Sequence, residues 1–88
     1  MKLIIAIVRD TDNDNVSHAL MASEFRVTGI ASTGGFLRRG QSTLLIGLED
    51  SQVPQALEII RTHCTPATEP DQKSAVIFVL KVDQYIHY

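Results

Sequence analysis

Residues 25–48 read FRVTGIASTGGFLRRGQSTLLIGL, and they predict two strands joined by a glycine-rich segment. The run from Phe25 to Ser32 alternates in polarity, with Arg26 and Thr28 on the same face, as in a half-buried strand. The run from Thr43 to Leu48 is mostly apolar and predicts a second strand. Because the two runs are close in sequence, we expect them to pair antiparallel around the glycine-rich segment between them.

Two further strands and two helices are predicted outside this hairpin. Residues 3–8 (LIIAIV) and 75–80 (AVIFVL) are apolar and rich in β-branched residues, which is typical of central strands covered on both faces. A short amphipathic helix is predicted over roughly residues 14–23, after a polar turn at 10–15 in which Asp12 or Asn13 would be the cap.

The second helix is predicted to open at Asp50 or Ser51, with Pro54 tolerated in its first turn. Its apolar stripe is spaced by steps of four, three and four residues, and consists of Val53, Leu57, Ile60 and Cys64. Residues 65–72 contain two prolines and predict a loop before the last strand.

The predicted order is β-α-β-β-α-β in a single domain covering residues 1–88. This order is that of the ferredoxin-like plait, an α+β fold with a four-stranded antiparallel sheet and two helices on one face. The other face of such a sheet is left uncovered. Strands that are apolar on both sides therefore predict a partner on that face, most simply other copies of the same chain.

Composition narrows the function classes. The chain has 88 residues and a net charge of −2, so no general basic field attracts nucleic acid. The single cysteine, Cys64, excludes an internal disulfide and fits a reducing compartment. The apolar run at residues 3–8 is too short for a signal sequence or a membrane span. We therefore expect a cytoplasmic location without membrane insertion.

The segment 32–43 is the strongest chemical signal. It holds three glycines, two arginines and four hydroxyl residues. Glycines bring backbone N–H groups close to a ligand, and arginine pairs with phosphate or stacks on a flat ring. The composition suits a small molecule that carries phosphate and a ring, against which Phe36 would pack. The alternative is a β-hairpin loop whose charges are merely solvated.

Two familiar sites are excluded by missing residues. Gln41 occupies the lysine position of a P-loop, and a strand rather than a helix follows it, so nucleoside triphosphate hydrolysis is not predicted. Acidic residues at positions 10, 12 and 14 imitate the start of a calcium loop. Asn15 and Met21, however, replace the glycine and glutamate that such a loop needs.

No catalytic or metal-binding constellation is apparent. His18, His63 and His87 lack metal-ligand spacing, and Cys64 belongs to an apolar stripe, which predicts a core residue. No metal, cofactor or enzymatic activity is therefore expected. A small hydrolase on the same fold is the enzymatic alternative, and it lacks a visible nucleophile or acid–base pair.

Four segments together resemble the PII-like family of cyclic di-AMP receptor proteins. They are residues 1–8 (MKLIIAIV), 25–28 (FRVT), 32–43 (STGGFLRRGQST) and 45–47 (LIG), and TGGFLR at 33–38 is the most specific part. The resemblance implies a homotrimer that binds its ligand in the clefts between subunits. It also implies a non-enzymatic sensor that changes loop conformation and signals to a downstream protein that the sequence does not identify.

The resemblance also implies which residues contact the ligand. Carried over position by position, they are Arg26, Thr28, Thr33, Gly34, Gly35, Phe36, Leu37, Gln41, Gly47, Phe78 and His87. The chain differs from the family pattern in three places. Gln41 replaces an asparagine, His87 replaces an amide residue, and segment 65–73 is much shorter than the family's loop. These differences keep an alternative open, a trimer that binds another nucleotide or metabolite, or a protein-interaction module.

Overall fold

The computed structural model of the protein describes residues 1–30, 40–66, 75–84 and 86. The predicted element order is confirmed. In chain order the elements are β1 (Lys2–Arg9), α1 (Asp10–Ala22), β2 (Arg26–Ile30), β3 (Gln41–Leu48), a 3₁₀ turn η1 (Asp50–Gln52), α2 (Val53–His63) and β4 (Ala75–Lys81).

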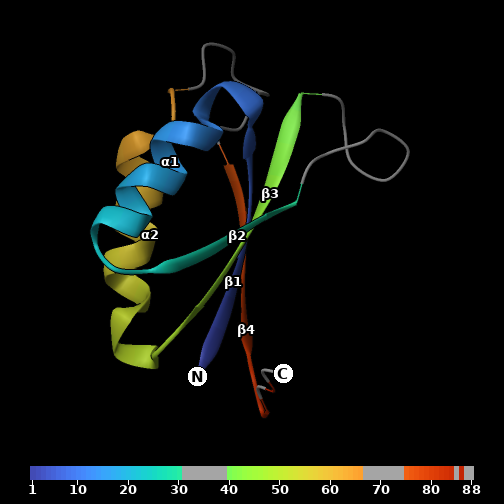
Figure 1. Ribbon diagram of the computed structural model, residues 1–88, viewed down its shortest axis with the longest axis vertical. Coiled ribbons are helices and arrows are strands. Elements are labelled where there is room, and N and C mark those ends of the chain that lie inside the picture. The colour runs from blue at the N-terminus through green and yellow to red at the C-terminus, as the bar shows by residue number, and fades with distance from the viewer. Residues whose placement is uncertain (31–39, 67–74, 85, 87–88) are drawn as a thin grey trace.

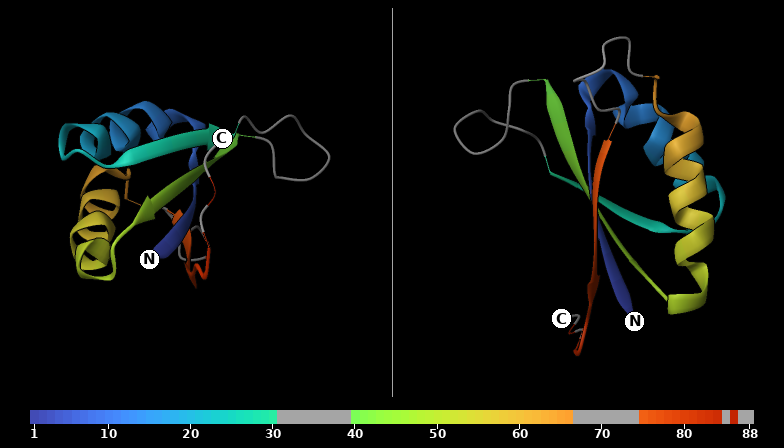
Figure 2. Two further views of the ribbon diagram at one scale, coloured as in Figure 1. Left: turned by 60° about the horizontal axis from the view of Figure 1, so that its bottom comes forward. Right: turned by 180° about the vertical axis from the view of Figure 1, so that it is seen from behind.

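The four strands form one antiparallel sheet in the order β2-β3-β1-β4. Both helices lie on the same side of the sheet, as seen in Figure 1 and again from behind in Figure 2. No described helix or strand covers the other side, which we call the open face. The predicted architecture, a plait with two helices on one face, is therefore confirmed.

The hydrophobic core lies between the sheet and the two helices. Ile4, Ala6 and Val8 of β1 point into it and are at most 1% exposed. They meet Val16 and Leu20 of α1 within the same cluster of buried residues. Alternation along each strand places every second side chain in this layer and the others on the open face.

Helix α1 begins earlier than predicted. The expected turn at 10–15 is wrong, because α1 starts at Asp10 directly after β1. Neither predicted cap acts as one, since the N-cap is Arg9 and no side chain caps the helix. Two other interactions fix this helix start. The Asp10 N–H donates to the Gly40 carbonyl oxygen at 2.8 Å, and the Ser42 hydroxyl donates to the Asp10 carboxylate.

Asp12 joins the start of α1 to the end of α2. It is only 2% exposed. The Thr65 N–H donates to its Oδ2 at 3.0 Å and the Thr65 hydroxyl donates to its Oδ1 at 2.5 Å. A buried carboxylate needs such partners. Its role is thus to hold two distant segments together.

Helix α2 begins two to three residues later than predicted, because the 3₁₀ turn η1 occupies the expected start at Asp50 and Ser51. Pro54 lies in its first turn, and Ile60 and Cys64 of the predicted stripe are buried, at 0% and 8% exposed. Cys64 immediately follows the helix as its C-cap, so the predicted core role of this residue is confirmed. Within the described residues, neither helix is long and apolar enough to cross a membrane.

Candidate functional site

The strand register brings separated sequence positions onto one row of the open face. Arg26 of β2 lies opposite Gly47 of β3. Gly47 in turn lies opposite Leu3, and Leu3 opposite Leu80 of β4. Paired residues share a face in an antiparallel sheet. Arg26 and Gly47, both predicted to contact a ligand, are therefore direct neighbours.

The next row carries two more of the predicted residues. Thr28 pairs with Leu45, Leu45 with Ile5, and Ile5 with Phe78. Thr28 and Phe78 are separated by three strand spacings, about 14 Å. Arg26, Thr28, Gly47 and Phe78 thus share the open face, with apolar side chains between the β2 edge and the β4 edge.

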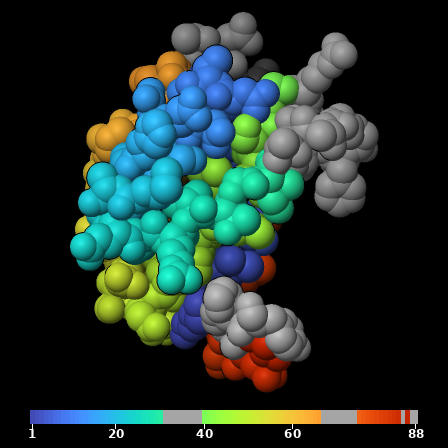
Figure 3. Space-filling view, viewed as in Figure 1, coloured from blue at the N-terminus to red at the C-terminus, as the bar shows by residue number. Residues whose placement is uncertain are grey.

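The space-filling view shows β2 at the molecular surface beside α1, with the end of β4 at the lower edge (Figure 3). Arg26 and Thr28 are exposed, and Phe78 is 50% exposed. A phenylalanine this accessible on a strand is available to stack on a ring or to pack against another chain.

Gly47 faces the Met1 side chain on the open face. Its backbone does not adopt the positive φ that favours glycine, which among described glycines occurs only at Gly40, at 82°. A Cβ at Gly47 would lie 3.1 Å from the Met1 methyl carbon Cε, the end of a flexible side chain. The fold itself therefore places little demand on glycine here. The Met1 methyl group lies over this glycine, so another group could approach the sheet at Gly47 only if the Met1 side chain moved.

The open face has one sign of charge. Its strand positions are Leu3, Ile5, Ile7, Arg9, Arg26, Thr28, Ile30, Gln41, Thr43, Leu45, Gly47, Val76, Phe78 and Leu80. Two of these are arginines and none is acidic. Within the described part of the chain, neither arginine forms an ion pair. Apolar surface with unpaired guanidinium groups suits an anion attached to flat rings.

The remaining predicted site residues are placed only in part. Gln41 is the first residue of β3, opposite Arg9 and on the open face. Thr33, Gly34, Gly35, Phe36, Leu37 and His87 lie outside the described residues. Their proposed contacts therefore stay predictions.

Sequence reasoning missed two residues of the open face. Arg9 and Thr43 each have a buried polar atom, Nη2 and Oγ1 respectively, without a hydrogen-bond partner. The alternation of β1 and β3 could have placed both on this face. The lack of partners depends on tertiary packing and leaves no signal in the sequence.

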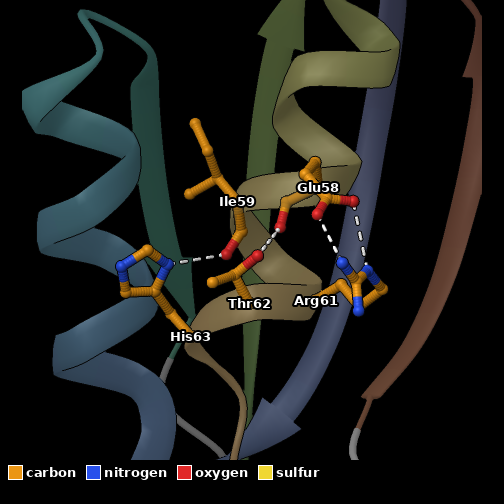
Figure 4. Close-up of polar contacts among 5 residues, drawn as sticks. All are labelled: Glu58, Ile59, Arg61, Thr62 and His63. Carbon is orange, nitrogen blue, oxygen red and sulfur yellow. Dashed lines mark hydrogen bonds and ion pairs between the residues drawn. The ribbon is translucent and has the colours of Figure 1, made fainter.

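The end of α2 carries polar groups that serve the helix itself (Figure 4). His63 Nδ1 donates to the Ile59 carbonyl oxygen at 2.8 Å, and the Thr62 hydroxyl donates to the Glu58 carbonyl oxygen at 2.7 Å. Arg61 pairs with the Glu58 carboxylate, which lowers the pKa of Glu58 and raises that of Arg61. His63 thus helps to terminate a helix.

Cys64 is electrostatically suited to remain a thiol. Burial raises its pKa, and the nearby Asp12 carboxylate raises it further, against a smaller lowering by Arg9. A thiol with a raised pKa is a poor nucleophile and a poor metal ligand. Among the described residues, no group of three or more histidine, cysteine or acidic side chains is arranged to hold a metal ion.

Comparison with known proteins identifies the family. The sequence model of the cyclic-di-AMP receptor family matches residues 1–70, which include β1 to α2. The fold is similar to the crystal structure of a functionally unknown protein from Pediococcus pentosaceus, with a TM-score of 0.82 and 36% sequence identity. That similarity covers 99% of this chain and 96% of the other. The chain belongs to the cyclic-di-AMP receptor family.

Proposed function

We propose that this protein is a non-catalytic cytoplasmic receptor that binds cyclic di-AMP on the open face, at the subunit interfaces of a homotrimer. The observation that carries the proposal is the gathering of Arg26, Thr28, Gly47 and Phe78 on one acid-free face. Membership of a cyclic-di-AMP receptor family supports the choice of ligand.

Each residue would contribute a distinct interaction. The Arg26 guanidinium would pair with a phosphate oxygen, and the Thr28 hydroxyl would add a hydrogen bond beside it. Gly47 would let the ligand approach the strand once the Met1 side chain moves aside. Phe78 would stack on an adenine or bound its pocket. Because Phe78 lies about 14 Å from Thr28 across the sheet, a compact ligand would contact Phe78 of one subunit and Arg26 of another.

The same face supports assembly. Ile30, Phe78 and Leu80 are 45–50% exposed on it, and Leu3, Ile5 and Ile7 are only half-buried. A small monomer gains stability by covering such a surface. Three copies packed through their open faces would bury it and would create clefts at the β2 edges. Ligand binding would then rearrange segment 31–39, which joins β2 to β3.

A second candidate keeps the trimer and changes the ligand. The family match ends at residue 70, before β4 and the C-terminal residues, so Phe78 and His87 lie beyond it. Gln41 and His87, which differ from the family pattern, would reshape the pocket around the base. Another nucleotide or metabolite, or a partner protein, would then occupy the same clefts.

Isothermal titration calorimetry with cyclic di-AMP, ATP and cyclic di-GMP separates these candidates. We expect selective binding of cyclic di-AMP near one ligand per subunit. Sedimentation on the same samples should give a trimer. Hydrogen exchange of peptides covering residues 31–39 should slow on binding. Selective binding of ATP, or of none of the three, would favour the second candidate.

The matched variants are Arg26→Ala and Arg61→Ala. Arg26→Ala removes the charged contact to the phosphate, so it should weaken cyclic di-AMP binding by roughly tenfold to a hundredfold or more, while the trimer persists. Arg61 lies on α2, away from the sheet face, and is exposed, so its variant should bind like the parent. Unchanged binding by the Arg26 variant would remove Arg26 from the site.

A further inference from the structure

Two polar groups at one end of the open face have no partner. The Thr43 hydroxyl oxygen and the Arg9 Nη2 nitrogen are both buried without a hydrogen bond. Thr43 as a whole is only 7% exposed. Buried polar groups are almost always paired, so each such group calls for an explanation. In the described part of the chain these are the only two side chains in this state.

The register relates the two groups to each other. Arg9 pairs with Gln41, and Thr43 lies two residues further along β3 on the same face. Diagonal neighbours of this kind are about 7–8 Å apart at the backbone, within reach of a long side chain. The Asp10–Gly40 backbone hydrogen bond of 2.8 Å continues the pairing beyond Arg9 and holds this end of the sheet in register.

The nearby carboxylates are already engaged. Asp10 accepts from the Ser42 hydroxyl, and both carboxylate oxygens of Asp12 accept from Thr65. The Arg9 charge acts as far as the Cys64 thiol, whose pKa is nevertheless raised by burial and by Asp12. A protonated thiol is no counter-ion. Among the described residues, Arg9 thus has no anion with which to pair.

We propose that Arg9 and Thr43 form a second anion-binding subsite, which takes a phosphate oxyanion at the β1–β3 end of the open face. The guanidinium supplies charge and a fork of donors, and the hydroxyl supplies one more donor. The subsite lies beyond the Arg26 row, because Thr43 and Gly47 are four residues apart on β3, about 13 Å. The phosphate is either a free ion or a group of the nucleotide, and only the second case rests on the proposed function.

The variants are Arg9→Gln, Thr43→Val and Thr43→Ser, with Arg61→Gln as the exposed charge control. Each is titrated calorimetrically with inorganic phosphate and, separately, with cyclic di-AMP. Arg9→Gln should weaken phosphate binding about tenfold or more, as expected for loss of a charged contact. Thr43→Val should weaken it less, Thr43→Ser should retain it, and Arg61→Gln should leave it unchanged. Weakening that is confined to cyclic di-AMP would assign the subsite to the nucleotide.

Thermal unfolding without ligand supplies an independent readout. Thr43→Val keeps the shape of the side chain and removes an unpaired hydroxyl, so its Tm should equal or exceed that of the parent. A lower Tm would mean that the hydroxyl already has a partner, and would overturn the subsite. A change in the oligomeric state of Thr43→Val would also overturn the subsite, because the hydrogen-bond partner of Thr43 would then belong to another subunit.

The two proposals fail separately. Parent protein that binds phosphate through Arg9 but ignores cyclic di-AMP would refute the proposed ligand and leave the subsite intact. Cyclic di-AMP binding that responds to Arg26→Ala and not to Arg9→Gln, with no phosphate binding, would refute the subsite alone.

Discussion

The two faces of β1 differ in their surroundings although their residues are alike. Ile4, Ala6 and Val8 point toward the helices and are almost fully buried. The alternate residues Leu3, Ile5 and Ile7 are equally apolar, yet they lie on the open face and are only half-buried. Apolar residues along a strand thus mark surface that will be covered, but the pattern does not distinguish coverage by the same chain from coverage by another.

Polar groups show the same contrast. On the helix side, the buried Asp12 carboxylate accepts two hydrogen bonds from Thr65. On the open face, the buried Thr43 hydroxyl has no partner. On the helix side, the apolar side chains and the Asp12 carboxylate find their partners within one chain. The open face keeps exposed apolar surface and unpaired polar groups that another molecule could contact.

The largest expected effect compares neighbouring isoleucines of β1. Ile4→Ala should lower the free energy of unfolding by about 2–5 kcal/mol, because it empties a fully packed site. For a monomer, Ile5→Ala should cost about 1 kcal/mol, since a half-buried side chain loses less surface. Chemical denaturation of both variants measures the difference.

Protein concentration sharpens this test. If copies of the chain cover the open face, Ile5→Ala should weaken assembly, so its oligomer should dissociate at a higher protein concentration than that of Ile4→Ala, as sedimentation would measure. Equal costs for both variants at every concentration would contradict the distinction between the faces.

The next effect concerns the satisfied polar group on the helix side. Asp12→Asn keeps the size of the side chain but turns one acceptor toward Thr65 into a donor. The variant should lose about 1–3 kcal/mol of stability, as expected when buried hydrogen bonds are broken. Asp14→Asn is the control, because Asp14 is exposed on the same helix. Similar melting temperatures for the two variants would show that the Asp12–Thr65 contact contributes little.

The smallest expected effect is a difference in the rate of thiol modification between Cys64 and a cysteine placed on the open face. Because burial and Asp12 raise the pKa of Cys64, Cys64 should react slowly with a thiol reagent at pH 8 and faster as the pH rises. A thiol placed on the open face by Thr28→Cys, with Cys64→Ser, should react at the rate of an exposed cysteine. Ligand bound to that face should slow the second reaction and leave the first unchanged.

Much of the fold followed from local pattern. The alternation around Arg26 and Thr28 and the stripe ending in Cys64 predicted strand and helix correctly. The start of α1 did not follow, because Asp10 and Asp12 resemble turn residues when read alone. Their actual partners, Ser42 and Thr65, are 32 and 53 residues away, and sequence spacing carries no trace of such contacts.

The candidate site divides in the same way. The residue types suited to a phosphate-bearing ligand, such as Arg26 and the glycine-rich segment, could be recognised from sequence. That Arg26, Gly47 and Thr28 share a face with Phe78 depends on the register across four strands. A shift of one residue would send any of them into the helix layer.

Local patterns were enough to predict the element order, the apolar strands and the glycine-rich connection, because periodicity and turn chemistry act over a few neighbouring residues. The tertiary structure was needed to show which face of the sheet the helices cover, which strands lie at the edges, and which buried polar atoms lack hydrogen-bond partners. Those features arise from register and packing between segments that are distant in the chain. Register and packing thus distinguish the buried layer beneath the helices from the open face, which can bind another molecule.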